Sequence, residues 1–263
     1  MSYGKRIRLG RVLDLENSKS IIFPIDHGGY MGPIKGVEDA WKVIELGVKC
    51  GADSILLHKG LLKKYSSELS KYAKKLGFIL RVSGALYVPR ETSFETVISS
   101  VEEALLLGAD AVAFTLYVGG ENYNEAIKFF GELVDVCDAW GVPVLGECLP
   151  AETLGEGVEA VKIAIRVGAE LGADIIKTIY AEPFEEVVDV CPVPVVIAGG
   201  SKKSPNYVLK MVEKAIEAGA AGVCIGRNVF QHERPELMMK AIKAIVKDGK
   251  SFEEALEMLK SGE

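Results

Sequence analysis

One lysine stands out among the residues whose type and position could carry chemistry. Lys177 lies in the apolar run 175–179, where Val or Ile would be the ordinary choice in a buried strand. A buried ammonium needs a reason, because desolvation penalises its charged form. Burial and a cationic neighbour would both favour the neutral amine, which attacks ketones and forms a Schiff base. The alternative is an ion pair with a carboxylate such as Asp26 or Glu147.

Two carboxylates and a tyrosine are candidates for work beside that lysine. Asp26 ends the apolar run 21–25 and could orient a substrate hydroxyl or act as a general base. Otherwise it caps the following loop or neutralises Lys177. Glu147 and Tyr180 stand at the ends of later apolar runs and could move protons, although a tyrosine in such a position is usually a packing residue.

Two glycine-containing turns predict a phosphate ligand. Gly199, Gly200 and Ser201 follow the seventh apolar run, and Gly226 and Arg227 follow the eighth. Glycine lets backbone amides approach an anion closely, and arginine adds charge and hydrogen bonds. Glycines at both turns exceed what two tight turns require, so we expect a phosphate site there.

His27 and Ser83 complete the predicted substrate-binding residues, since both stand where apolar runs end. A lone barrel histidine is more often packed or hydrogen-bonded than catalytic, so we expect His27 to contact the substrate and not to act as a catalyst. No two histidines stand at metal-ligand spacing with a carboxylate. We therefore expect no metal ion, and a covalent Schiff base on Lys177 would need no bound cofactor.

Eight short apolar runs must position these residues, and each precedes a stretch of helical period. Gly-Ala-Asp at 51–53, 108–110 and 172–174, and the related 219–221, each end a helical stretch and open an apolar run. This alternation predicts an α/β fold, a single-domain (β/α)8 TIM barrel over residues 1–263. We expect 1–18 to be a short N-terminal extension, over the barrel bottom or a neighbouring subunit, and 251–260 to be a last helix. The expected strands are 20–27, 53–59, 78–83, 110–118, 143–148, 174–179, 194–199 and 222–226.

Composition narrows the partners of such a barrel. The 263 residues are 49% hydrophobic and carry a net charge of -6, so no broad positive field attracts nucleic acid or an anionic membrane. No long apolar run or leader pattern is present, which predicts a cytoplasmic protein. A single glutamine, Gln231, is typical of a thermophile.

Four segments carry a resemblance to a known family: 26–28, 177–178, 198–200 and 226–231. They resemble the DhnA-type class I aldolases, which include archaeal fructose-bisphosphate aldolases, aminodideoxyheptulosonate synthases and the LsrF thiolase. The similarity extends over nearly the whole chain, and the C-terminal half is most similar to LsrF.

The resemblance implies that Lys177 is the Schiff-base lysine, that Asp26 assists at the substrate, that Arg227 and the two turns hold a phosphate, and that the subunits form a ring-shaped homo-oligomer. One departure matters. Aldolases of this family carry Tyr-Pro-Arg-Gly after the fifth strand, and its tyrosine acts as acid and base, whereas this chain has Leu149 in its place. Glu147, Tyr180 or water would then replace the hydroxyl, or the reaction differs.

We therefore expect a Schiff-base enzyme that makes or breaks a carbon–carbon bond in a small phosphorylated keto sugar or ketone, as fructose-bisphosphate aldolase does. One alternative is an LsrF-like thiolase that transfers an acetyl group from a phosphorylated pentanedione to coenzyme A. Another is a barrel that binds a sugar phosphate or a flavin without catalysis.

Overall fold

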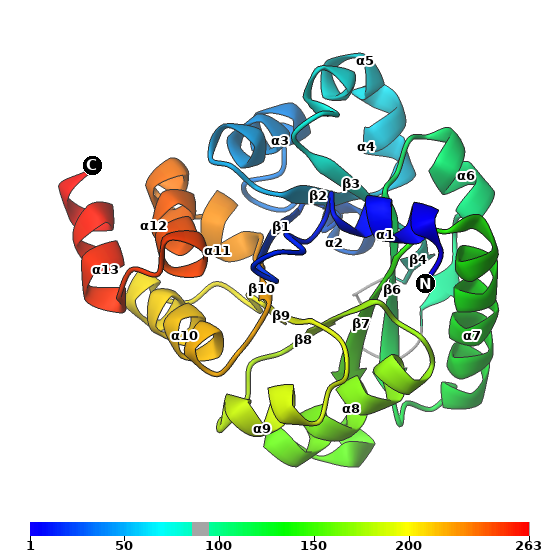
Figure 1. The fold of residues 1–263 in the computed structure, drawn as a ribbon. Coiled ribbons are helices and arrows are strands. Elements are labelled where there is room, and N and C mark those ends of the chain that lie inside the picture. Colours follow the sequence, from blue (N-terminus) through cyan, green and yellow to red (C-terminus); the bar gives the residue numbers. More distant parts are fainter. Residues whose placement is uncertain (86–94, 263) are drawn as a thin grey trace.

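Eight parallel strands close into a barrel in the order β1-β10-β9-β8-β7-β6-β3-β2 (Figure 1). The structure, a computed structural model, describes residues 1–85 and 95–262. Each barrel strand overlaps one of the predicted runs, so the expected (β/α)8 architecture is confirmed. The barrel strands are β1 Ser20–Pro24, β2 Ser54–Leu57, β3 Gly77–Arg81, β6 Ala111–Val118, β7 Val144–Pro150, β8 Ile175–Thr178, β9 Val195–Ala198 and β10 Gly222–Cys224.

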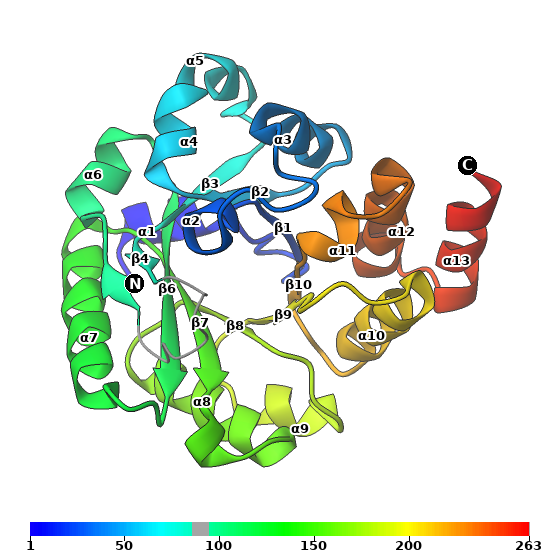
Figure 2. The ribbon, with the colours of Figure 1, turned by 180° about the vertical axis from the view of Figure 1, so that it is seen from behind.

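Helices form a ring outside the strands, as Figures 1 and 2 show from opposite sides. Their apolar residues recur at helical spacing and face the sheet; in α10 these are Val208, Leu209 and Val212. No helix in the described part of the chain is long and apolar enough to cross a membrane. The longer helices are α3 Ala40–Lys49, α7 Tyr123–Trp140, α8 Val158–Glu170, α10 Pro205–Glu217, α12 Pro235–Asp248 and α13 Phe252–Ser261. The shorter ones are α1 Tyr3–Leu9, α2 Gly28–Met31, α4 Lys59–Lys64, α5 Ser66–Leu69, α6 Val101–Leu106, α9 Phe184–Asp189 and α11 Arg227–Phe230, with 3-10 turns at Ser70–Tyr72 and Glu152–Leu154.

The inside of the barrel changes from apolar to charged along its length. Alternate residues of a strand point to the same face, so positions two apart share the interior. Two positions beyond the apolar floor, Arg81, Glu147 and Lys177 occupy β3, β7 and β8. The period of the strands thus places charged groups at the C-terminal mouth, next to an apolar floor. That floor consists of Ile22, Leu56, Ile79, Ala113, Leu145, Ile175, Val196 and Cys224.

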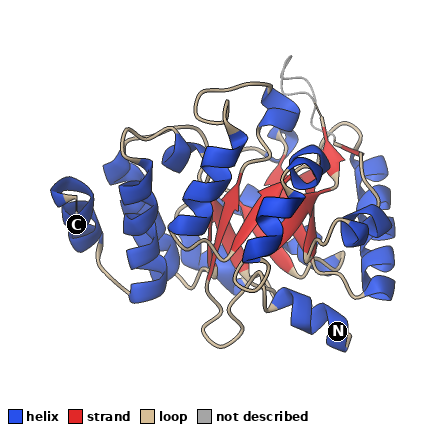
Figure 3. Cartoon of the chain, turned by 90° about the horizontal axis from the view of Figure 1, so that it is seen from above, coloured by secondary structure: helices blue, strands red, loops and turns tan. Residues whose placement is uncertain are grey.

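The N-terminal extension closes the opposite end. Leu9, Val12 and Leu13 are buried in the same cluster as the apolar floor. In the side view of Figure 3, the helix at the N-terminus lies beyond one end of the strands. The extension therefore covers the barrel bottom, the first of the two positions that we predicted for it.

The Gly-Ala-Asp repeats have a second function at this bottom. Each aspartate accepts the backbone N–H at the start of a neighbouring strand and also pairs with a cation. Asp53, Asp110 and Asp174 accept from Ile21, Phe78 and Val144 at 2.7, 3.0 and 2.8 Å. Their cations are Lys247, Arg11 and Lys5 at 2.9, 2.7 and 2.8 Å. The aspartates of the repeats therefore link neighbouring strands, and two of them also bind Arg11 and Lys5 of the N-terminal extension.

One pair of strands was not predicted. β4 Ser83–Gly84 and β5 Thr96–Val97 form a small antiparallel pair beyond the end of β3. Strands of two residues are too short to give a periodic signal. The pairing of Ser83 with Val97 brings Glu95 to the barrel mouth.

Candidate active site

The register of the barrel sheet places three polar residues side by side at its mouth. Thr115 of β6 pairs with Glu147 of β7, which pairs with Lys177 of β8. Paired residues of parallel neighbours point to the same face, so all three side chains enter the barrel. Glu147 and Lys177, two candidates that stand far apart in the chain, thereby become direct neighbours, with Thr115 beside them.

Lys177 is buried, with 7% of its surface exposed, and its Nζ lies 2.6 Å from Oε1 of Glu147. Burial alone would lower the pKa of Lys177, but Cys224, Glu147 and Asp26 outweigh burial and raise it above its usual range. Burial raises the pKa of the Cys224 thiol to about 12, so at neutral pH the thiol is uncharged and the carboxylates of Glu147 and Asp26 are what keep Lys177 an ammonium. The expectation that burial leaves this lysine uncharged at rest is therefore wrong. The ion pair, which was the alternative from the sequence, is present because the register supplies its partner.

Arg81 is the centre of the cluster, and sequence reasoning did not select it. Its Nε donates to Asp26 at 2.9 Å, its Nη1 to Thr115 at 2.8 Å and its Nη2 to Glu147 at 2.5 Å. Although burial opposes ionisation, Arg81 and Lys177 hold the pKa of Glu147 down to about 2. The sequence did contain a sign of its importance: Arg81 is a charged residue at the end of an apolar strand, and the same kind of pattern drew attention to Lys177.

Asp26 keeps one oxygen free of the arginine. Arg81 binds Oδ2, while Oδ1 lies 3.8 Å from Nδ1 of His27, beyond hydrogen-bond distance. Burial opposes ionisation of Asp26, but Arg81, His27 and Lys177 hold its pKa well below the usual range. It is thus a fixed carboxylate with spare accepting capacity, suited to a substrate hydroxyl.

Two histidines beside Asp26 carry unpartnered ring nitrogens. Nδ1 of His27 and Nε2 of His58 are buried and have no hydrogen-bond partner among the described residues. Burial lowers the pKa of His27 to about 4 and also lowers that of His58, so both rings are neutral at pH 7. A cavity of about 410 Å³ is lined by Asp26 and His58 together with apolar residues and glycines. No group of three or more His, Cys, Asp or Glu in residues 1–85 and 95–262 is arranged to hold a metal.

Tyr180 lies outside this cluster. Its hydroxyl donates to Oε1 of the exposed Glu182 at 3.0 Å, and its ring stacks on Phe184. The structure therefore does not bring the hydroxyl predicted for proton transfer to the Lys177–Glu147 pair. Leu149, where family aldolases have tyrosine, stands in register with Tyr117 of β6.

The glycines of the two turns each have a local structural reason. A Cβ on Gly199 would lie 2.8 Å from Ile225, and one on Gly226 would lie 2.6 Å from the carbonyl oxygen of Pro24. Gly200 has φ +64°, a conformation that favours glycine. Glycine content is thus a weaker sign of an anion site than the sequence suggested. Arg227 is a stronger one, because its buried Nε has no partner among the described residues.

Asn228 joins the two turns and was not among the predicted site residues. Its Nδ2 donates to the carbonyls of Gly199 at 2.7 Å and Ser201 at 3.2 Å, and its Oδ1 accepts the Lys203 N–H at 2.8 Å. The amide side chain therefore fixes the exposed turn of β9, where Ser201 lies, against Arg227. Ser83, by contrast, is buried across the mouth, where its Oγ accepts the Thr115 N–H at 3.0 Å.

Comparison with known proteins agrees with this geometry. The family model of DeoC/LacD family aldolases matches residues 20–232. The 2-amino-3,7-dideoxy-D-threo-hept-6-ulosonate synthase 1 of Archaeoglobus fulgidus is 40% identical over 254 residues, which cover 97% of this chain and 95% of that one. The 3-hydroxy-5-phosphonooxypentane-2,4-dione thiolase of Escherichia coli is 34% identical over 262 residues, covering 98% and 87%.

Solved structures give the same result. An archaeal fructose 1,6-bisphosphate aldolase superposes with a TM-score of 0.81 at 29% identity, covering 92% of this chain and 98% of the other. Another structure of an archaeal fructose-1,6-bisphosphate aldolase, with a TM-score of 0.81, 28% identity and 92% and 99% coverage, has its catalytic lysine covalently bound to the carbinolamine intermediate of the substrate. These matches confirm the family expected from the sequence. The chain belongs to the DeoC/LacD family of aldolases, whose chemistry rests on a Schiff base.

Proposed function

We propose that this chain uses Lys177 to attack the ketone of a small phosphorylated substrate and then makes or breaks the adjacent carbon–carbon bond. The single observation that carries the proposal is the buried Lys177–Glu147 contact of 2.6 Å at the barrel mouth. It joins the nucleophile to a group that can accept its proton.

Glu147 has the geometry for the proton transfers of Schiff-base formation. As the ketone approaches, Oε1 takes a proton from the Lys177 ammonium, and the free amine adds to the carbonyl carbon. The resulting carbinolamine loses its hydroxyl as water when Glu147 returns the proton, and a positively charged imine remains. Arg81 stays bound to Glu147 Oε2 at 2.5 Å and keeps the carboxylate in place between these steps.

Asp26 and the two turns would orient the substrate. The free Oδ1 of Asp26 is placed to accept a substrate hydroxyl. The unpartnered Nε of Arg227 and the backbone of 199–201, fixed by Asn228, form the side of the mouth where we place the phosphate. The chain would need no metal or bound cofactor for these steps.

The test is a pair of assays on the same protein. Aldol chemistry predicts cleavage of fructose 1,6-bisphosphate or a related ketose phosphate into two carbonyl fragments. Catalysis of neither this reaction nor the thiolase reaction below, across a panel of ketose phosphates and phosphorylated diones, would contradict the proposal. It would favour a barrel that binds a sugar phosphate or a flavin, and the absorption of bound flavin would separate those two.

A second function is favoured by one residue. Leu149 removes the hydroxyl that family aldolases use, and a relative at 34% identity is a thiolase. Formation of acetyl-coenzyme A from 3-hydroxy-5-phosphonooxypentane-2,4-dione and coenzyme A would assign the chain to acyl transfer. The cytoplasmic location, the ring-shaped homo-oligomer and the thermophilic source stay predictions from the sequence.

A further inference from the structure

A third carboxyl group enters the barrel mouth from outside the strands. Glu95 precedes β5, and the pairing of β5 with β4 sets Val97 opposite Ser83. The side chain of Glu95 is half-buried and reaches Ser83 of β4 and Thr115 of β6. It is the one carboxyl of the described mouth that a loop supplies.

Two hydroxyls hold this carboxyl in a fixed orientation. Ser83 Oγ already accepts the Thr115 N–H at 3.0 Å, and its own proton goes to Oε2 of Glu95. Thr115 also binds Glu95. The same Thr115 hydroxyl accepts from Arg81 at 2.8 Å and lies 3.3 Å from Oε2 of Glu147. The Thr115 hydroxyl therefore lies between Glu95 and the Lys177–Glu147 pair and contacts both Glu95 and Glu147.

The charges around Glu95 differ from those around the other two carboxylates. Burial raises the pKa of Glu95, and repulsion from Glu147 adds to this, while Arg81 and the hydroxyls of Ser83 and Thr115 only partly oppose it. Asp26 and Glu147 have strongly lowered pKa values: Arg81 holds Asp26 as a carboxylate, and Glu147 exchanges its proton with Lys177 across their 2.6 Å contact. A general base works best when its pKa lies near the operating pH. Of the three carboxylates, Glu95 is the one whose pKa is raised, so it is the strongest base.

The cycle needs such a group in addition to Glu147. Glu147 takes one proton from Lys177 and returns it to the departing water, so its part ends when the imine forms. Breaking the carbon–carbon bond then requires a base for the substrate hydroxyl beside that bond. The lowered pKa of Asp26 beside Arg81 makes it a poor base for this hydroxyl, and the Tyr180 hydroxyl is bound to Glu182 outside the cluster.

We propose that Glu95 is the general base and acid of the carbon–carbon step, an inference that rests on the proposed function. In the cleavage direction its carboxylate removes the proton from the substrate hydroxyl, whose oxygen forms the new carbonyl as the carbon–carbon bond breaks. The bonding pair moves to the imine and leaves a neutral enamine on Lys177. The enamine carbon then takes the proton back from Glu95, which restores the imine for hydrolysis by water.

The experiment separates this step from Schiff-base formation. Glu95→Gln and the control Glu152→Gln, an exposed residue after β7, are each compared with the unchanged chain. One assay measures cleavage of fructose 1,6-bisphosphate; the other measures borohydride trapping of the same ketose phosphate on the protein. We expect Glu95→Gln to lose about 10²–10⁴-fold in cleavage while trapping is kept. The control should change neither.

Three results would overturn the proposal. Cleavage by Glu95→Gln within about threefold of the unchanged chain would remove Glu95 from the chemistry while leaving the Schiff base intact. Equal loss of trapping and cleavage in a folded variant would place Glu95 before the carbon–carbon step. Failure of the unchanged chain to trap any ketose phosphate would contradict the proposed function itself, and this proposal with it.

Ser83→Ala keeps the proposal falsifiable if Glu95→Gln does not fold. The Ser83 hydrogen bond lowers the pKa of Glu95, so its loss should move the acidic limb of the cleavage pH profile to higher pH. Among residues 1–85 and 95–262, the charged and titratable groups that act on Glu95 or lie close to it are Arg81, Glu147 and Tyr117, and none of them is changed. An unmoved acidic limb would contradict the assignment, because a merely structural serine would change the rate without shifting the limb.

Discussion

The two ends of this barrel both bury polar groups, but the bottom pairs its carboxylates with cations, whereas the mouth keeps ring and guanidinium nitrogens without partners among the described residues. At the bottom, each Gly-Ala-Asp carboxylate accepts a strand N–H and pairs with a cation. At the mouth, His27, His58 and Arg227 keep buried nitrogens without partners in the described structure. Paired charges join strands together, whereas polar groups without a partner are available to a ligand.

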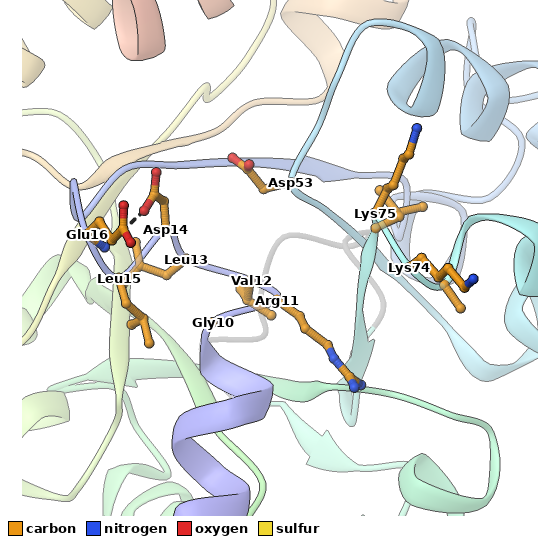
Figure 4. Close-up of a pocket in the computed structure, with 12 residues that line it drawn as sticks. Gly10, Arg11, Val12, Leu13, Asp14, Leu15, Glu16, Asp53, Lys74 and Lys75 are labelled. Carbon is orange, nitrogen blue, oxygen red and sulfur yellow. Dashed lines mark hydrogen bonds between the residues drawn. The ribbon is translucent and has the colours of Figure 1, made fainter.

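Cavity size alone would give the wrong answer. The bottom has a cavity of about 700 Å³ between residues 10–16 of the extension and Lys74 and Lys75 (Figure 4). The cavity beside Asp26 measures about 410 Å³. The smaller cavity is the one beside the reactive cluster, since Asp26 lines it. This position agrees with the rule that the catalytic groups of such a barrel extend from the C-terminal ends of its strands.

The largest expected effect comes from the buried lysine at the mouth. Lys177→Met removes the nucleophile but leaves Glu147 bound to Arg81 at 2.5 Å. We expect activity to fall by about 10⁴-fold or more, with little change in the thermal unfolding midpoint. Steady-state kinetics and a melting curve check both parts. Retention of full activity would exclude Lys177 from the chemistry.

The matched substitution at the bottom should have the opposite result. Lys5 is 3% exposed and pairs with Asp138 at 2.5 Å and Asp174 at 2.8 Å. Lys5→Met leaves the buried Asp174 without its cation, so we expect a loss of about 3–5 kcal/mol in the free energy of unfolding. Urea titration measures that loss. The kcat of the folded fraction should not change, and a large drop in kcat would weaken the division between the two ends.

His27 supplies a pH test of the mouth. Burial lowers its pKa from the usual 6.5 to about 4, so the folded state binds fewer protons than the unfolded chain between these values. Its contribution to stability is complete above pH 6.5 and is lost as the pH falls toward 4. His27→Gln should therefore flatten the decrease of the urea midpoint over this interval. An equally steep decrease in the variant would contradict the assignment.

The smallest effect is expected at the turns. Asn228→Ala removes the hydrogen bonds that hold Gly199 and Ser201 beside Arg227. We expect the KM for a phosphorylated substrate to rise about tenfold, equivalent to about 1.4 kcal/mol, with kcat nearly unchanged. A matched substrate without the phosphate should show no such change. Equal effects on both substrates would place the phosphate elsewhere.

The sequence was sufficient for the eight barrel strands because each is a buried apolar run followed by a helical period. It also selected Asp26, Glu147 and Lys177, since a charged residue ending an apolar strand is unusual. The charge state of Lys177 depended on which strand stands next to it, and register is not readable from one strand. Glu95 could not be predicted as a site residue, because its position is set by a pair of strands of only two residues each. Asn228 escaped because its role lies in joining two turns.

The central claim is tested most directly by locating the trapped substrate in the protein. The chain is reduced with borohydride in the presence of dihydroxyacetone phosphate or 3-hydroxy-5-phosphonooxypentane-2,4-dione, digested and mapped by mass spectrometry. We predict one covalent adduct, on Lys177, that is absent from Lys177→Met. An adduct confined to other lysines, or none with any phosphorylated ketone tried, would contradict it.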